Sequence, residues 1–170
     1  GVGALFNDHK GSKSTAIGHN ALVAQDFATS TDTFNTAVGF SAGNEVTTGV
    51  SNTLIGSTAG DALTVGGSNT VLGRDALSAD TKGSRSVAIG EAALQSQNFT
   101  TATENYNIAV GYAAGANVTT GAQNTIVGGL AADALTTGGL NVAFGLHALG
   151  GDTKGSRSTA LGYSALLTQN

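Results

Sequence analysis

Few residues of this chain have the types and spacing that catalysis or metal binding needs. The histidines His9, His19 and His147 occupy unrelated positions, and none lies at the spacing of a metal motif or beside paired carboxylates. There is no cysteine, which excludes disulfides and thiolate metal sites. The glycines form no phosphate-binding loop that continues into Lys and Ser or Thr. We therefore predict that the chain is not an enzyme and that it has no catalytic residue, cofactor or metal.

Four aromatic residues are the candidates for ligand contact: Phe27, Phe34, Phe99 and Tyr106. They lie in two matching segments, 25–34 and 97–106, each of which belongs to a repeat unit four residues longer than its neighbours. Insertions in repeat proteins map to loops on one face, often the binding face. The alternative, which we favour, is that the rings fill a neighbouring coil or chain, because an exposed aromatic loop costs more than a buried one.

The elements that position these loops are copies of one five-residue phrase, Asn-Thr-Ala-Val-Gly at 35–39. Nine copies close on the glycines at positions 18, 39, 56, 73, 90, 111, 128, 145 and 162. Neighbouring glycines follow a 17-residue period, except for a 21-residue interval before Gly39 and another before Gly111. Positions 18, 90 and 162 are therefore equivalent, and the chain has a 72-residue block. Periods of this length indicate a solenoid, in which each unit buries its apolar surface only against neighbouring units.

Each phrase predicts a short strand that is apolar on both faces. The run before the glycine is too short for a helix and rich in β-branched residues, and its side chains alternate between two sides. We expect the face with Val38 to fill the interior of the coil. The mostly small second face then needs a second copy of the chain to cover it. The trimer-interface candidates are Ala16, Ala37, Leu54, Val71, Ala88, Ala109, Ile126, Ala143 and Ala160.

The rest of each coil is equally regular. An alanine three residues after every phrase glycine predicts a tight corner, and segments such as 46–49, 63–66, 118–121 and 135–138 predict a second, weaker strand. The asparagines that begin most phrases predict a hydrogen-bonded ladder, and the segments 80–85 and 152–157 predict a solvated ion-pair corner. The expected fold is all-β: a parallel β-roll or β-solenoid of about ten 17-residue coils, with one 21-residue coil per block.

The composition limits the classes of partner that the chain is expected to bind. A net charge of -4, with 11% charged residues, gives no basic field for nucleic acid. No apolar run reaches the roughly 18 residues of a membrane helix, so we expect no membrane insertion by this segment. With no signal peptide and no initiating methionine, residues 1–170 are expected to form a single β-roll domain taken from a longer fibre protein.

The phrase Asn-Thr-Ala-Val-Gly, with its alanine three residues on, resembles the head repeat of trimeric autotransporter adhesins and similar phrases in bacteriophage tail-fibre shafts and bacterial surface fibres. The resemblance covers the whole chain. It implies a left-handed parallel β-roll, three copies side by side with the small face at the three-fold axis, an extracellular location on a cell-surface or virion fibre, and attachment to surfaces. The 17-residue coil is longer than that of the adhesin heads, so no functional residue is carried over.

Three function classes follow. The first is a structural and adhesive segment of a trimeric fibre that attaches to a cell-surface glycan, protein receptor or polymer, or a passive shaft that spaces a separate receptor-binding tip. The second is an ice-binding solenoid that uses a threonine array of Thr47, Thr64, Thr119 and Thr136. The third is a solenoid enzyme, which the sequence disfavours because no cluster of acids or bases gathers on one face.

Overall fold

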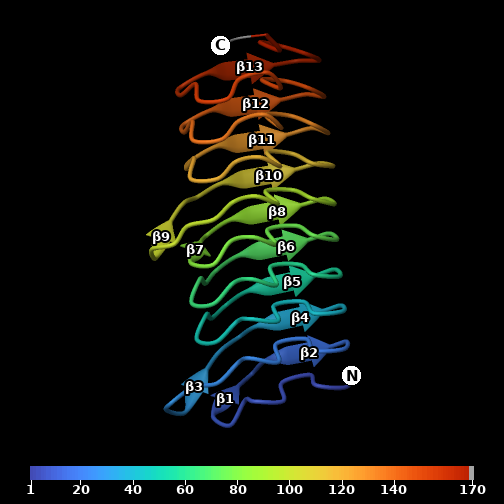
Figure 1. Cartoon of the computed structure of the whole chain (residues 1–170), viewed down its shortest axis with the longest axis vertical. Coiled ribbons are helices and arrows are strands. Elements are labelled where there is room, and N and C mark those ends of the chain that lie inside the picture. Colours follow the sequence, from blue (N-terminus) through green and yellow to red (C-terminus); the bar gives the residue numbers. More distant parts are fainter. Residues whose placement is uncertain (169–170) are drawn as a thin grey trace.

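The computed structural model describes residues 1–168 and shows a rod of about nine stacked coils, spaced about 17 residues apart, with no helix in that range (Figure 1). Nine strands form one parallel sheet along the rod, in the order β2-β4-β5-β6-β8-β10-β11-β12-β13. Their bounds are β2 Thr15–Ile17, β4 Thr36–Val38, β5 Thr53–Ile55, β6 Thr70–Leu72, β8 Val87–Ile89, β10 Ile108–Val110, β11 Thr125–Val127, β12 Val142–Phe144 and β13 Thr159–Leu161. The all-β solenoid predicted from the phrase is confirmed.

Every strand pairs with the next at the same position of the repeat. Ala37 lies opposite Leu54 in the β4–β5 pair, and Ala88 lies opposite Ala109 in the β8–β10 pair, although the latter two are separated by a 21-residue coil. The four extra residues are therefore accommodated outside the sheet and do not shift its register. Equivalent residues of successive coils consequently form continuous ladders along the rod.

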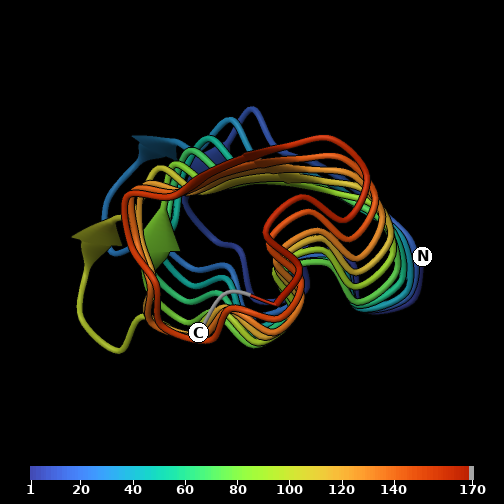
Figure 2. The same cartoon turned by 90° about the horizontal axis from the view of Figure 1, so that it is seen from above.

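The longer coils add two small sheets beside the main one. Strand β1 (Gly11–Ser12) pairs with β3 (Thr31–Asp32), and β7 (Gly83–Ser84) pairs with β9 (Thr103–Glu104). Viewed along the rod, both insertions project from the same side of the cross-section (Figure 2).

The second strand predicted for each ordinary coil does not form. The segments 46–49, 63–66, 118–121 and 135–138 contain bends, and only some of their amides bond to the next coil. The Thr47 N–H donates to the Thr64 carbonyl at 2.9 Å, and the Gly49 N–H donates to the same oxygen at 3.2 Å. The glycine corner follows so closely that no continuous ladder develops.

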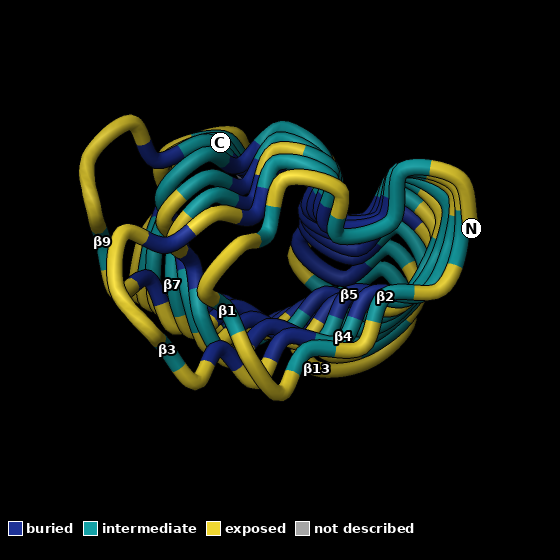
Figure 3. Tube along the Cα trace, turned by 90° about the horizontal axis from the view of Figure 1, so that it is seen from below, coloured by how far each residue is buried: buried dark blue, intermediate teal, exposed yellow. Residues whose placement is uncertain are grey.

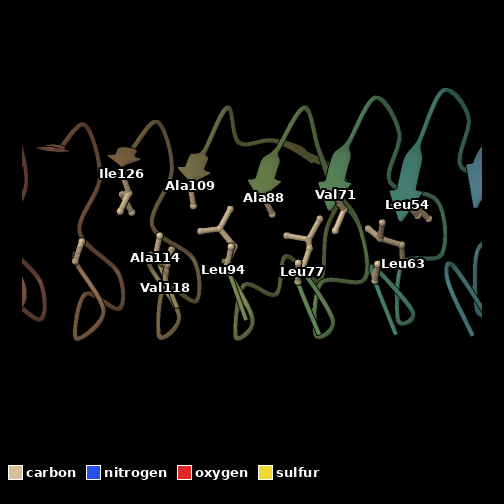
Figure 4. Packing of buried hydrophobic residues seen from close by; sticks show 14 of the residues in the cluster. Leu54, Leu63, Val71, Leu77, Ala88, Leu94, Ala109, Ala114, Val118 and Ile126 are labelled. Atoms are coloured by element: carbon tan, nitrogen blue, oxygen red, sulfur yellow. The ribbon is translucent and has the colours of Figure 1, made fainter. Parts of the chain in front are cut away.

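The core lies inside the coils, and the small strand face lines it. Leu54, Val71, Ala88 and Ile126 are fully buried in the single chain, and their side chains point toward the alanine corners and leucines of the opposite wall (Figure 4). The corner alanines of the inner coils are likewise fully buried, as the uniform alanine position predicted. Figure 3 shows this buried band running along the interior of the rod, with the exposed residues outside it.

Large residues in the interior alternate between two positions, the strand and the residue after the corner alanine, so that the core volume stays similar along the rod. The residue after each corner alanine has a left-handed backbone, with φ 52° at Leu22 and 59° at Gly43. At Gly43 an added Cβ would approach Leu54 Cδ1 to 2.6 Å, so the larger Leu54 on the strand requires glycine at the corner. Where the strand of the next coil supplies Ala109, the corner supplies the buried Leu94 instead.

Buried polar ladders hold the coils in register. The Asn52 N–H donates to Asn35 Oδ1 at 2.9 Å, and Asn52 Nδ2 donates to the Gly66 carbonyl at 3.0 Å, which confirms the asparagine ladder. Asp80 was predicted to belong to a solvated ion-pair corner, but it is fully buried. Its carboxylate accepts from the Gly83 N–H at 3.0 Å and from Gln97 Nε2 at 2.6 Å, because the corner turns the aspartate toward the unpaired amides inside the coil.

Candidate interaction surfaces

The first candidate surface is the outward side of the nine-stranded sheet, which we call the outer strand face. It consists of the first and third residues of each strand and contains no charged side chain in the nine described strands. Several of its aliphatic and aromatic residues are between 46% and 73% exposed: Ile17 58%, Leu72 46%, Phe144 51% and Leu161 73%. The first residue of six of the nine strands is threonine, so the face is uncharged and carries its exposed apolar side chains chiefly at the third position. Exposed apolar side chains gathered on one face are typical of an interaction site.

The two strand faces are thus the reverse of the sequence prediction. The trimer-interface candidates lie in the interior of their own coil: Ala37, Leu54, Val71, Ala88, Ala109, Ile126, Ala143 and Ala160 are at most 1% exposed, and Ala16 is partly buried against the same core. As interface residues these nine were the wrong choice. These second-position residues face inward and pack in one cluster with the corner alanines and leucines. The third-position residues, such as Val38 and Ile55, lie on the opposite face and point outward.

The second candidate surface is formed by the two insertions. In the first, Lys13 Nζ lies 2.7 Å from Asp32 Oδ2 and 5.2 Å from the centre of the Phe34 ring. The second repeats this arrangement, with an ion pair of 2.7 Å and a cation over a ring at 5.6 Å. The two clusters are related by the 72-residue block and retain side-chain class at each position: Lys13 and Arg85, Asp32 and Glu104, Phe34 and Tyr106.

Hydrogen bonds shift the acidities of these clusters. The pKa of Asp32 is lowered, chiefly by the hydrogen bond from Lys13 and then by that from Ser12. The Tyr106 hydroxyl donates to Glu104 at 2.8 Å; this bond lowers the pKa of Glu104 and raises the pKa of Tyr106. Both carboxylates are therefore ionised across the neutral pH range, and each is already paired with a cation.

The four predicted ligand-loop residues divide into two kinds. Phe27 and Phe99 are 8% and 7% exposed, so both rings are buried within the chain, which agrees with the interpretation that they fill a neighbouring coil. Phe34 and Tyr106 are 55% and 45% exposed in the single chain. The residues between these rings, 28–30 and 100–102, are exposed at the tips of the insertions.

The sequence analysis missed two ladders that flank the outer strand face. The leading ladder is the residue before each polar phrase-starter, and the trailing ladder is the residue after each phrase glycine. The leading ladder reads Lys13, Phe34, Ser51, Ser68, Arg85, Tyr106, Gln123, Leu140 and Arg157; the trailing ladder reads His19, Phe40, Ser57, Arg74, Glu91, Tyr112, Gly129, Leu146 and Tyr163. Every leading residue is exposed, and so are all trailing residues except Ser57 and Gly129. Reading the residues on either side of the phrase would have found both ladders.

The threonine array proposed for ice binding is engaged within the fold. The Thr64 hydroxyl donates to the Thr81 carbonyl at 2.9 Å, and the Thr47 hydroxyl donates to the Thr64 carbonyl at 3.2 Å. Of the histidines, His19 stacks on Phe40 with ring centres 5.4 Å apart. Across residues 1–168 there is no pocket and no group of three or more potential metal ligands. In the same range, no helix has the length and apolar character that crossing a membrane requires.

Comparison with protein families, with curated proteins and with solved structures finds no match to this chain. The fold alone defines the class of this protein, an all-β parallel β-solenoid.

Proposed function

We propose that this chain is a structural and adhesive segment of an extracellular trimeric fibre, on a bacterial cell surface or a virion tail, that attaches to a cell surface or polymer. The outer strand face is the observation that carries the proposal. This face runs along the whole described rod and contains no charged side chain. Residues on it such as Leu72 and Phe144 are about half exposed. The core of a protein interface is similarly depleted of charged residues.

Three copies suit the dimensions of this face. From the leading to the trailing ladder the chain advances six residues, which is about 20 Å when extended. Three such faces around an axis parallel to the rod enclose a triangular prism whose centre lies about 6 Å from each face. Packed sheets lie about 10 Å apart, so each sheet's side chains fill about 5 Å. Side chains the size of valine, isoleucine and leucine therefore fill the centre of a trimer, whereas four copies leave a hollow.

Sedimentation equilibrium tests the assembly. The expected mass is three times the 16.6 kDa of the chain. A mass of one chain at micromolar concentration would contradict the proposal.

The insertions support the adhesive part of the proposal. They project from one side at a 72-residue interval, and their clusters keep cation, acid and aromatic, whereas some other exposed positions change class between blocks. His19, for example, corresponds to Glu91 and Tyr163 in the later blocks. Four coils at about 4.8 Å place the insertions roughly 19 Å apart, which lets a long polymer engage both at once.

Shortening the insertions tests adhesion. Removing four residues from each of 26–33 and 98–105 gives both coils the length of their neighbours. Parent and variant are compared, as labelled protein, for binding to bacteria, cultured animal cells and a panel of surface polysaccharides. We expect the parent to bind and the variant not to bind. The variant should keep the parent's oligomeric state and circular dichroism spectrum. If the parent does not bind, the passive-shaft alternative is favoured. If parent and variant bind equally, the insertions do not contribute to binding.

A further inference from the structure

The two ladders that flank the outer strand face match each other in chemistry, coil by coil. Phe34 at the start of β4 corresponds to Phe40 at its end, and Tyr106 at the start of β10 corresponds to Tyr112 at its end. Both positions thus change together from phenylalanine to tyrosine between the two blocks. Each of these four rings is between 45% and 59% exposed in the single chain.

The match extends beyond the aromatic residues. Leu140 corresponds to Leu146, and these residues are 48% and 46% exposed. Ser51 corresponds to Ser57. Four of the nine coils therefore carry the same residue type in both ladders. In a fifth coil the leading residue is Arg85 and the trailing residue is the oppositely charged Glu91. In the remaining four coils, no aliphatic side chain corresponds to a charged one.

No contact within the chain accounts for this match. Leading and trailing residues of one coil lie at opposite ends of an extended segment of six residues, up to about 20 Å apart. The contacts that the structure shows run along each ladder instead. Lys13 lies over Phe34 in the leading ladder, and His19 stacks on Phe40 in the trailing ladder.

A rotation axis parallel to the rod brings the two ladders together between chains. Such a rotation keeps every residue at its height, and the strands of all copies run in the same sense around the axis. The end of each strand therefore meets the start of the equivalent strand in the next copy, as in any closed head-to-tail ring. Like or complementary residues at one height then face each other, as cross-strand pairs do in a sheet.

We propose that the leading ladder of one copy contacts the trailing ladder of the next copy at the same height. The occupant of this surface is thus a second copy of this chain, with Phe34 on Phe40, Tyr106 on Tyr112, and Leu140 on Leu146. The inference rests on the proposed assembly and adds the pairing that fixes its axial register. A slip of one coil opposes Phe34 to Ser57 in one direction and Arg85 to Arg74 in the other, so mismatched and like-charged pairs select against other registers.

The charged pair extends a network that exists in the single chain. Arg85 Nη2 lies 2.7 Å from Glu104 Oε1, and Glu91 pairs with Arg74 of the preceding coil. Contact between Arg85 of one copy and Glu91 of the next joins these two pairs into one alternating row of charges. Networks of this kind hold their side chains better than isolated exposed pairs do.

Disulfide trapping tests the pairing directly, because the chain has no cysteine of its own. The test variant is Ser51→Cys with Ser57→Cys, which places one thiol in each ladder of the same coil. Within one chain the two thiols lie too far apart for a disulfide, which needs Cα atoms within about 7 Å. Mild oxidation should therefore link different chains, and closure of the ring should give a covalent trimer on a non-reducing gel.

The matched control is Ser51→Cys with Leu146→Cys, in which the second thiol lies in the trailing ladder five coils away, roughly 24 Å along the rod. It should stay uncrosslinked, as should each single variant. Sedimentation of the reduced proteins separates the outcomes. Ring closure only in the matched variant supports the inference. A trimer without crosslinks, or with equal crosslinking in the control, overturns the ladder pairing but leaves the proposed assembly. A crosslinked dimer supports the ladder pairing and contradicts the trimeric assembly. A monomer contradicts both the pairing and the assembly.

Discussion

Replacing Leu72 and Phe144 by serine tests whether the outer strand face holds the assembly together. These side chains are 46% and 51% exposed in the single chain. Complete burial of a side chain of this size contributes about 1.5–3 kcal/mol, so the exposed half of each is worth about 1 kcal/mol once an assembly covers it. Two positions in three copies amount to about 6 kcal/mol, which corresponds to about four orders of magnitude in the association constant.

The assay is sedimentation equilibrium over a dilution series, with circular dichroism of the same samples. The single chain loses only the half of each side chain that it already buries, about 1 kcal/mol per site, so the strand signal should remain. We expect the variant to approach the 16.6 kDa of one chain at concentrations where the parent is fully associated.

Val65→Ser is the matched control. Val65 is 44% exposed but lies outside the nine-stranded sheet, so its replacement removes a similar apolar surface and should leave the mass unchanged. If the Leu72 and Phe144 variant keeps the parent's mass at the lowest concentration, the outer strand face is not the interface and the reasoning is refuted.

Three further predictions concern the single chain. Asn107→Ala should lower the free energy of unfolding by about 3 kcal/mol in urea titration, because it leaves the buried Asn124 N–H and other partners unsatisfied; a loss below about 1 kcal/mol would show that the asparagine ladder contributes little. Gly56→Ala should prevent folding, seen as loss of strand signal, because φ there is 136° and the new Cβ would overlap the Gly73 carbonyl oxygen of the next coil; a native spectrum would contradict the close stacking. Burial raises the pKa of Asp61 above its usual 3.8, so the unfolded chain releases this proton first and stability falls as pH rises past that value. Asp61→Asn should therefore stabilise the chain at pH 7 and lose this advantage at pH 3, and an equal effect at both would exclude the ionised carboxylate as the cause.

Much of the architecture follows from spacing. Phrase glycines at regular intervals require coils that stack in register, and the uniform alanine after them requires a corner with no room for a larger side chain. The asparagine ladder is predictable for the same reason, because a buried polar residue at one position of every coil has its equivalents as neighbours. The second strand was less predictable, since Val46-Thr47-Thr48 has strand-forming residues and only the adjacent glycine corner prevents a continuous ladder.

The candidate surfaces were less accessible to sequence reasoning. Alternation shows that Ala37 and Val38 lie on opposite faces of one strand, but it does not say which face is inside when both are apolar. A larger residue in the core is the usual expectation, and it led to the wrong face here. Phe27 and Phe34 illustrate the same limit, because they belong to one insertion and yet only the first is buried.

The sequence by itself therefore determined the period, the strand positions, the tight corners and the location of the insertions, because each is a property of neighbouring residues or of a fixed repeat. Only the tertiary structure decided which strand face is enclosed, because that depends on how closely the opposite wall approaches. Ala88 is fully buried in one core cluster with Leu77 and Leu94, whereas its neighbour Ile89 lies on the other strand face and is only partly buried. The third residues of the strands are consequently turned outward, and the surface available for assembly is the one they help to form.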